Sequence, residues 1–178
     1  MRYRILYIVI ILTVFQSCSN RDSNEHRIKQ RIGEGIYFPE DYSVINDTIT
    51  IDLIDYNNPV QIIHLFNGDC GFCKGSLKKW EDYIENFIFK ENTDFIFLVY
   101  TSNEEFLRDD FLTKISFKQP VYLIDKDVFF RQNELPDQNI SSLTFLLIDN
   151  TIKGIGNPIY DNECKYFFVE VVLSYLDG

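Results

Sequence analysis

Hydrophobic residues follow a regular succession of patterns from about position 37 to the end of the chain. Strand-like runs predict three strands, over 60–66, 95–100 and 121–124, and the run over 95–100 is continuously apolar, as expected of a strand covered on both faces. Helical patterns predict four helices, over 75–87, 104–115, 127–134 and 162–175. Alternating segments around an Asn-Asp or Asp-Asn pair predict two β-hairpins, over 42–54 and 143–155. This order predicts an α/β fold with a mixed β-sheet, parallel at its centre, helices on both faces and an N-terminal β-hairpin.

The spacing within three of the helices predicts which side chains face the core. On the helix over 75–87 they are Leu77, Trp80, Ile84 and Phe87. On the helix over 104–115, which Thr101 or Ser102 is expected to cap, they are Phe106, Leu107, Phe111 and Ile115. On the last helix they are Phe167, Phe168, Val171, Val172 and Tyr175.

The N-terminal residues predict export. Arg2 and Arg4 precede an apolar run over 5–15, which is too short to span a bilayer as a helix. A basic start, a short apolar stretch and a small residue at its end are typical of a secretory signal. Its ending, Gln16-Ser17-Cys18, resembles a bacterial lipobox, which implies cleavage before Cys18 and a lipid on the thiol of that residue.

Three parts of the chain are therefore predicted. Residues 1–17 form a lipoprotein signal peptide, 18–35 contain the lipidated cysteine and a flexible tether, and 36–178 form one domain. The tether is predicted because residues 19–31 are polar, charged and without a pattern. The lipobox resemblance implies a lipid-anchored protein on the inner or outer membrane of a bacterial cell envelope, with its domain in an oxidising compartment such as the periplasm.

Composition and charge limit the classes of molecule that the protein is expected to bind. The 178 residues have a formal net charge of −10, which disfavours binding to nucleic acid or to anionic lipid headgroups. With 46% hydrophobic residues, the chain has enough apolar surface to fill the core of one domain. We expect a monomer whose contact with the membrane is made through the N-terminal lipid.

Two cysteines separated by two residues, Cys70 and Cys73, stand between a predicted strand and a predicted helix. This arrangement places the first thiol at a helix N-terminus, where free N–H groups and the helix dipole stabilise a thiolate. Lys74 favours a negative charge on Cys70, whereas Asp69 opposes it. We predict that Cys70 attacks a disulfide and that Cys73 resolves the mixed disulfide.

The export signal, the strand before Gly68-Asp69-Cys70-Gly71-Phe72-Cys73 and the helix after it together resemble the thioredoxin superfamily, in particular the membrane-anchored thiol–disulfide oxidoreductases of the TlpA/ResA type. The resemblance implies a thioredoxin-like fold and exchange of dithiol for disulfide with protein partners. It also implies a membrane electron donor or acceptor. Gly71 and Phe72 are then expected to influence the reduction potential and to contact substrate. The motif alone also resembles the DCC family, which implies the same chemistry.

One position departs from the family. Thioredoxin-like chains usually have a cis-proline just before the strand that corresponds to 143–148, and Leu143 stands there in this chain. A cis bond before a residue other than proline costs about 2.5–4 kcal/mol, so we expect the Ser142–Leu143 bond to be trans. An alternative alignment would place Pro120 at this point. Because substrates of the family pair beside it, Ser142, Leu143 and Thr144 are predicted to contact substrate.

Histidine, metal ligands and the last cysteine complete the candidates. His64 lies six residues before Cys70, where many thioredoxins have a buried acid, which implies proton transfer to or from Cys73; an ordinary core position is the alternative.

A zinc site needs four ligands, and only Cys164 and two histidines remain for it. We therefore expect no metal ion and no cofactor, and we expect Cys164 to pack in the core.

A non-enzymatic hypothesis stays open. In it, Cys70 and Cys73 form a structural disulfide, and the domain is a redox-inactive scaffold that binds a protein or a small ligand. Burial of both sulfur atoms would favour the scaffold, whereas an exposed Cys70 sulfur would favour the oxidoreductase.

Overall fold

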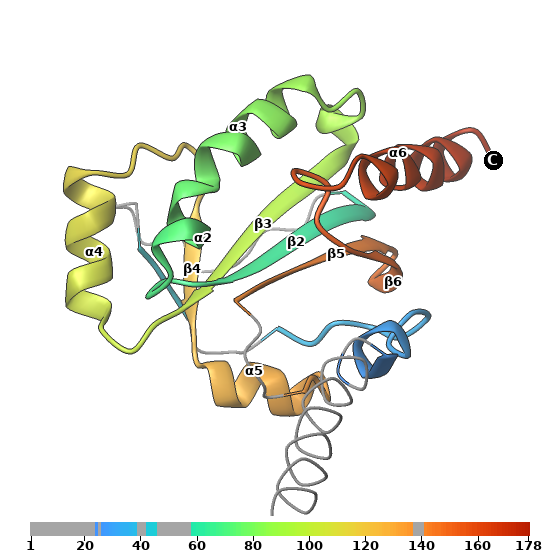
Figure 1. The fold of residues 1–178 in the computed structure, drawn as a ribbon. Coiled ribbons are helices and arrows are strands. Elements are labelled where there is room, and N and C mark those ends of the chain that lie inside the picture. The colour runs from blue at the N-terminus through green and yellow to red at the C-terminus, as the bar shows by residue number, and fades with distance from the viewer. Residues whose placement is uncertain (1–23, 25, 39–41, 46–57, 137–140) are drawn as a thin grey trace, which may run out of the picture.

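A six-stranded mixed β-sheet forms the centre of the domain. The computed structural model describes residues 24, 26–38, 42–45, 58–136 and 141–178 (Figure 1). Within them, the strand order is β1-β4-β3-β2-β5-β6. The strands are β1 (Tyr42–Val44), β2 (Val60–Asn67), β3 (Thr93–Tyr100), β4 (Val121–Ile124), β5 (Ser142–Ile148) and β6 (Thr151–Ile155). The three strands predicted over 60–66, 95–100 and 121–124 are β2, β3 and β4.

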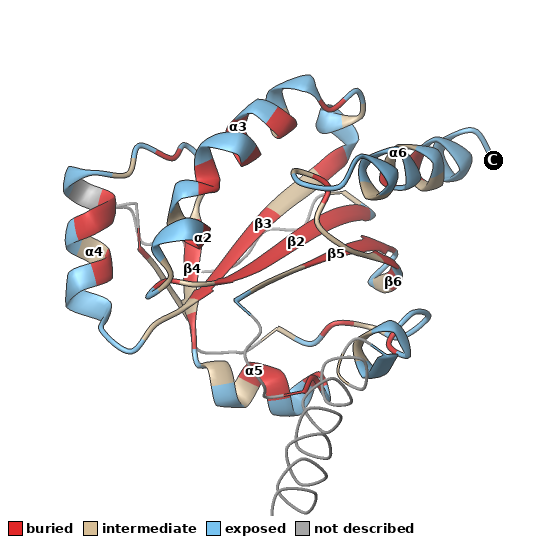
Figure 2. Cartoon of the chain, in the orientation of Figure 1, coloured by how far each residue is buried: buried red, intermediate tan, exposed pale blue. Residues whose placement is uncertain are grey.

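Strand β2 lies at the centre of the sheet and leads directly to the two cysteines. It pairs in parallel with β3 and antiparallel with β5, so that His64 is flanked by Phe97 and Thr144. Strand β3 continues in parallel to β4, whereas β1 and β6 add antiparallel edges. Because β2 is covered on both faces, all of its residues except the last are buried (Figure 2).

Helices cover the sheet on both faces, as predicted. They are α2 (Gly71–Gly75), α3 (Leu77–Asn86), α4 (Glu104–Thr113), α5 (Lys126–Gln132) and α6 (Asn162–Leu176), with a short 3₁₀ turn, η1 (Lys90–Asn92). Helices α3 and α6 lie on one side of the sheet and α5 on the other (Figure 1). Trp80 and Phe168 belong to the core on the first side, and Phe129 belongs to the core on the second side.

The second predicted hairpin is confirmed. Strands β5 and β6 pair around Asp149 and Asn150, whose φ angles are +49° and +56°. Positive φ at both central residues is the signature of a type I′ turn, whose twist matches that of the flanking strands. Of the first predicted hairpin, β1 is present and pairs with β4, whereas residues 46–57 lie outside the described part of the chain.

The N-cap and some core-facing side chains differ from the prediction. Asn103, rather than Thr101 or Ser102, caps α4, because its side-chain oxygen accepts a hydrogen bond from Phe106 N at 3.0 Å. The ring of Phe106 is exposed and lies 5.2 Å from Lys74 Nζ and 5.6 Å from Lys114 Nζ, so it contacts cations at the surface.

The apolar face of α6 is narrower than its sequence pattern predicted. Phe168 and Val172 are buried, but Phe167 and Tyr175 are exposed. Spacing along a helix shows which residues share a face, but not how wide a neighbouring surface covers that face. The width of the buried stripe therefore depends on how much of the sheet edge lies beneath the helix.

The segment before β1 packs against the domain. Arg31 is buried and forms ion pairs with Glu34 and Glu134, at 2.5 and 3.0 Å. Backbone hydrogen bonds join Gly33 and Glu34 to Ile152, so contacts with the domain begin before residue 36. The predicted signal peptide and Cys18 lie outside the described residues. Within the described residues, no helix combines the length and apolar character that crossing a membrane requires.

Gly154 provides a test of the packing between β6 and α6. A Cβ atom at this position would lie 2.7 Å from Phe167 Cε1 and 3.0 Å from Phe168 Cε1. Because Phe168 is fully buried and cannot move freely, Gly154→Ala is expected to lower the free energy of unfolding by about 1–3 kcal/mol. Urea denaturation at pH 7 measures this loss.

Gly75→Ala is the matched control, because no atom of the described residues lies within 4 Å of a Cβ atom there and the residue is helical. It is expected to leave stability unchanged or to raise it by up to about 1 kcal/mol. Equal stability of the two variants would show that α6 is not packed on Gly154 as the structure has it.

Candidate active site

The turn between β2 and α2 is held by main-chain and side-chain hydrogen bonds. Gly68 N donates to Tyr100 O at 2.8 Å, and Asp69 N donates to Asn67 Oδ1 at 2.8 Å. A Cβ atom on Gly68 would lie 2.8 Å from a methyl carbon of Leu107, so the close approach of α4 requires glycine here. These contacts fix the position at which α2 begins.

Cys70 and Cys73 are brought together as predicted. Cys70 is the N-cap of α2, and its sulfur accepts a hydrogen bond from Cys73 N at 3.3 Å. The two sulfur atoms lie 2.6 Å apart. Cys70 is half-buried, whereas Cys73 is 3% exposed. One thiol is thus accessible, and the other stands directly behind it at the start of the helix.

Burial gives Cys73 an environment different from that of Cys70. It raises the pKa of Cys73 to about 12, with further contributions from the hydrogen bond to Cys70 and from the charge of that residue. Cys73 Sγ also donates a hydrogen bond to Ser141 O at 3.4 Å, whereas the side chain of Ser141 and the backbone of Asn67 act to lower the pKa of Cys73. Cys73 is therefore a protonated thiol at neutral pH. Once Cys70 enters a disulfide its charge is gone, and deprotonation of Cys73 becomes easier.

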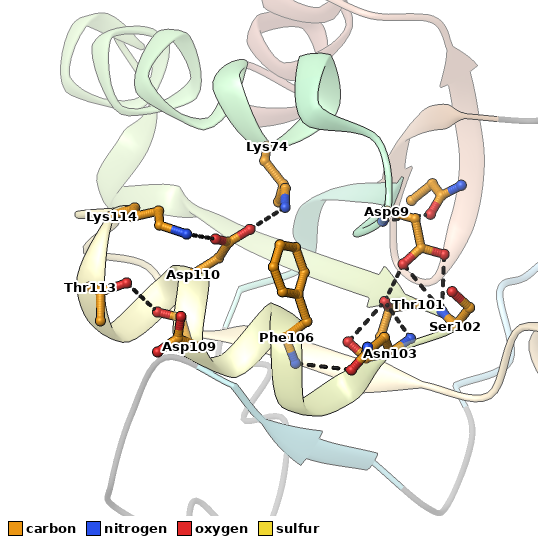
Figure 3. A network of polar contacts seen from close by, with 11 residues as sticks. Asp69, Lys74, Thr101, Ser102, Asn103, Phe106, Asp109, Asp110, Thr113 and Lys114 are labelled. Atoms are coloured by element: carbon orange, nitrogen blue, oxygen red, sulfur yellow. Dashed lines mark hydrogen bonds and ion pairs between the residues drawn. The ribbon is translucent and has the colours of Figure 1, made fainter.

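The charged neighbours of the dithiol, Asp69 and Lys74, both bind to the β3–α4 region (Figure 3). The Asp69 carboxylate accepts hydrogen bonds from Thr101 Oγ1 and from Ser102 N, the latter at 3.0 Å. Partial burial acts to raise the pKa of Asp69, but these hydrogen bonds and the charge of Lys74 lower it overall, so Asp69 is an anion at neutral pH.

Lys74 forms an ion pair with Asp110, which also pairs with Lys114 at 2.9 Å (Figure 3). The positive charge that we expected to favour a thiolate on Cys70 is therefore partly offset by Asp110. Asp69 and Lys74 stand at the two ends of the segment that contains the dithiol. Asp69 connects this segment to the loop before α4, and Lys74 connects it to α4 itself.

His64 is buried in β2 against Trp80 of α3. Its ring is 1% exposed, and its centroid lies 4.7 Å from that of Trp80. Its Nδ1 is 2.9 Å from Thr144 Oγ1, and its Nε2 has no hydrogen-bond partner within the described chain, so no direct hydrogen bond joins His64 to Cys73. Desolvation lowers the pKa of His64 from 6.5 to about 3, which keeps the ring neutral at physiological pH.

Comparison with known proteins identifies the fold. No protein-family model matches the sequence, and no curated protein is significantly similar to it. Among solved structures, a thioredoxin-related protein from Neisseria meningitidis serogroup B is 12% identical, with a TM-score of 0.55 over 75% of this chain and 99% of its own. The fold is thioredoxin-like. Two other structures agree with this assignment.

One is a putative thiol:disulfide interchange protein DsbE from Chlorobium tepidum, 14% identical, with a TM-score of 0.55 over 78% of this chain and 97% of its own. The other is a putative thiol-disulfide oxidoreductase from Bacteroides vulgatus, 20% identical, with a TM-score of 0.53 over 76% of this chain and 90% of its own. The predicted thioredoxin-like fold is therefore confirmed, and the Cys70–Cys73 pair lies at the start of the helix that follows its central strand.

The start of β5 is the other predicted part of the site in this thioredoxin-like domain. No peptide bond within the described residues is cis, so the Ser142–Leu143 bond is trans, as expected. Leu143 packs against the core on the α5 side of the sheet, whereas Cys73 belongs to the core on the opposite side. Thr144 is fully buried against His64. Of the three residues predicted here, Ser142 is the one whose side chain is both partly exposed and on the side of the dithiol.

Two residues near the dithiol were not found from the sequence. Ser141 O accepts the hydrogen bond from Cys73, and Tyr160 stacks on Phe72 with ring centroids 5.5 Å apart. Gly71 and Phe72, which were predicted, are both exposed in the first turn of α2. Tyr160 lies in the loop after β6, and only the order of strands in the folded sheet brings that loop beside α2.

Cys164 does not join the dithiol. It lies in the first turn of α6, half-buried and packed against the core that contains Trp80. Burial and the nearby Asp161 carboxylate raise its pKa to about 11. It is a protonated thiol at neutral pH, which makes it a poor nucleophile.

Proposed function

We propose that this chain is a thiol–disulfide oxidoreductase of the bacterial cell envelope that exchanges dithiol for disulfide with partner proteins. The observation that supports this most directly is the asymmetry of the two thiols. Cys70 is accessible at a helix N-terminus, and Cys73 is buried, protonated and 2.6 Å behind it. An attacking thiol and a resolving thiol need these environments.

In the reducing direction, the Cys70 thiolate attacks one sulfur of a substrate disulfide. A bond forms between Cys70 and that sulfur, and the other substrate sulfur leaves as a thiolate. Cys73 then attacks the sulfur of Cys70, the Cys70–Cys73 disulfide forms, and the second substrate thiol is released with the proton that Cys73 has lost. Two electrons pass from the dithiol to the substrate. The reverse sequence oxidises a substrate dithiol.

His64 is proposed to help move the proton of Cys73. Its Nε2 has no partner among the described residues, and its ring contacts Trp80 in the core that contains Cys73, so we propose a single water molecule as the link. If a His64→Phe variant resolves the mixed disulfide at the wild-type rate, His64 has no part in this step.

The remaining parts of the proposal come from the N-terminal sequence. Cys18 is proposed to be lipidated after removal of residues 1–17, so that the monomeric domain is held at the membrane. A membrane-bound electron donor or acceptor is then needed to recycle the dithiol, because the compartment is oxidising. The Cys18→Ser variant, followed by fractionation of the cells, tests the anchor. The variant is expected to leave the membrane fraction. If it stays there, a lipid on Cys18 is not what holds the protein at the membrane.

The reduction potential of the Cys70–Cys73 pair tests the activity. Titration of the full-length protein against dithiothreitol or glutathione is expected to give a potential between about −270 and −120 mV, the range of catalytic dithiols. Cys70→Ser is the control and is expected to show no two-electron transition. A pair that stays oxidised below about −300 mV, or exchanges only when the protein unfolds, would instead make this a structural disulfide in a binding scaffold.

A further inference from the structure

An exposed aromatic pair lies beside the dithiol. Phe72, between the two cysteines, is 71% exposed, and it stacks on Tyr160, which is 44% exposed. The ring centroids are 5.5 Å apart and the ring planes differ by 21°, a favourable stacked geometry. Lys79 Nζ lies 4.3 Å from the centroid of Tyr160. We call the surface formed by Phe72, Tyr160 and Lys79 the aromatic platform.

The loop that presents Tyr160 is ordered by its own hydrogen bonds. Tyr160 N and Asp161 N both donate to Asn157 O, at 3.2 and 3.1 Å, and Ile159 N donates to Asn157 Oδ1 at 3.3 Å. Pro158 is buried, and Ile159 packs against the core. The platform is thus pre-organised, and a ligand that binds to it does not need to order this loop.

We infer that the aromatic platform binds an apolar side chain next to the reacting cysteine of a protein substrate. This inference rests on the proposed exchange reaction. In the mixed disulfide, the substrate sulfur lies about 2 Å from Cys70 Sγ. Consecutive Cα atoms are about 3.8 Å apart, so the side chains next to the substrate cysteine must lie on the surface around Cys70. Phe72 is part of that surface.

The chemistry of this surface favours an apolar neighbour over an anionic one. The two exposed rings offer apolar area, and desolvated aromatic contacts often dominate binding energy at protein interfaces. Asp69, directly before Cys70, is held as an anion, and the whole chain has a formal charge of −10. Both disfavour small anionic disulfides such as glutathione disulfide. The expected substrate is therefore a protein segment in which an aromatic or aliphatic residue adjoins the cysteine.

Two peptides test this preference. Each contains one cysteine linked by a disulfide to thionitrobenzoate, and they differ only in the residue after the cysteine, which is phenylalanine or serine. The reduced full-length protein is mixed with each peptide, and the release of thionitrobenzoate is followed by absorbance. The phenylalanine peptide is expected to react about tenfold faster, because one well-placed aromatic contact at an interface changes binding by about this factor.

Variants then locate the preference. Tyr160→Ser and Phe72→Ser are expected to reduce the rate ratio of the two peptides to about one, and Tyr160→Phe to retain it. Ile88→Ser is the matched control, because Ile88 is also 71% exposed but is not part of the platform, and the ratio should stay near ten. All of these side chains are exposed, so the variants are expected to fold, which circular dichroism checks.

The outcomes separate this inference from the proposed function. If the wild type releases thionitrobenzoate from neither peptide, the oxidoreductase proposal fails. If it reacts with both peptides at one rate, or if Tyr160→Ser keeps the full ratio, the platform is not a substrate site, although the exchange reaction stands. Reaction with glutathione disulfide as fast as with the phenylalanine peptide would also overturn the inference.

Discussion

Cys73→Ser is expected to stop the exchange after its first step and to leave the protein covalently attached to its substrate. Cys70 is accessible and can still attack a disulfide, but the buried group 2.6 Å behind it is then a hydroxyl, which does not resolve the bond. Incubation with a disulfide-bonded protein, followed by gel electrophoresis without reductant, should show a mixed disulfide. Wild type should show almost none, because resolution inside one helical turn is fast.

Cys70→Ser is the matched variant and is expected to behave differently. The remaining thiol, Cys73, is buried, and burial, the largest cause of its raised pKa, is still present in this variant, so little thiolate exists at neutral pH. We expect the rate of exchange to fall by at least a factor of about 10³, with no mixed disulfide. If Cys70→Ser accumulated the mixed disulfide instead, the roles of the two thiols would be reversed.

Much of the fold could be predicted because its signals are local. The continuous apolar run over 95–100 predicted a covered strand, and β3 is buried over 96–99. Asp149-Asn150 between two alternating segments predicted a hairpin turn. The Cys70–Cys73 pair was found for the same reason, since it depends on a strand that ends and a helix that begins within a few residues. Each of these features is determined by neighbours in sequence.

The features that the sequence did not predict depend on contacts between distant segments. Tyr160 stacks on a residue 88 positions away, and Asp110 pairs with Lys74 from a different helix. The exposure of Phe167 depends on where the sheet ends beneath α6. A periodic pattern shows that residues share a face, but it does not specify which surface meets that face or how far it extends.

The same distinction between local and distant signals applies to His64. Its place in a central strand predicted burial, and burial is observed. Its partner was not predictable, because Thr144 lies opposite it only through the β2–β5 register. The hydrogen bond to Thr144 uses Nδ1 and leaves Nε2 among aromatic rings, so the ring is held neutral in the core. Its effect on stability can be measured independently of any catalytic role.

His64 is expected to make the domain unstable in mild acid. Its pKa is about 3 in the folded protein and 6.5 when the chain is unfolded, so between these values the unfolded state binds a proton that the folded state excludes. Stability from this group is therefore lost as the pH falls from 6.5 towards 3. Between pH 7 and pH 5 the loss amounts to about 2 kcal/mol. Urea denaturation at pH 7, 6 and 5 measures it.

The variant His64→Phe, combined with Thr144→Val, removes this dependence without leaving a buried hydroxyl unpaired. It should reduce the loss between pH 7 and pH 5 by about 2 kcal/mol, whatever its stability at pH 7. His26→Gln is the matched control, because His26 is the second of the two histidines and is exposed, so the slope should remain that of wild type. If the double variant lost stability between pH 7 and pH 5 as steeply as wild type, His64 would bind its proton in the folded domain. Its ring would then be accessible to water and not buried in the core.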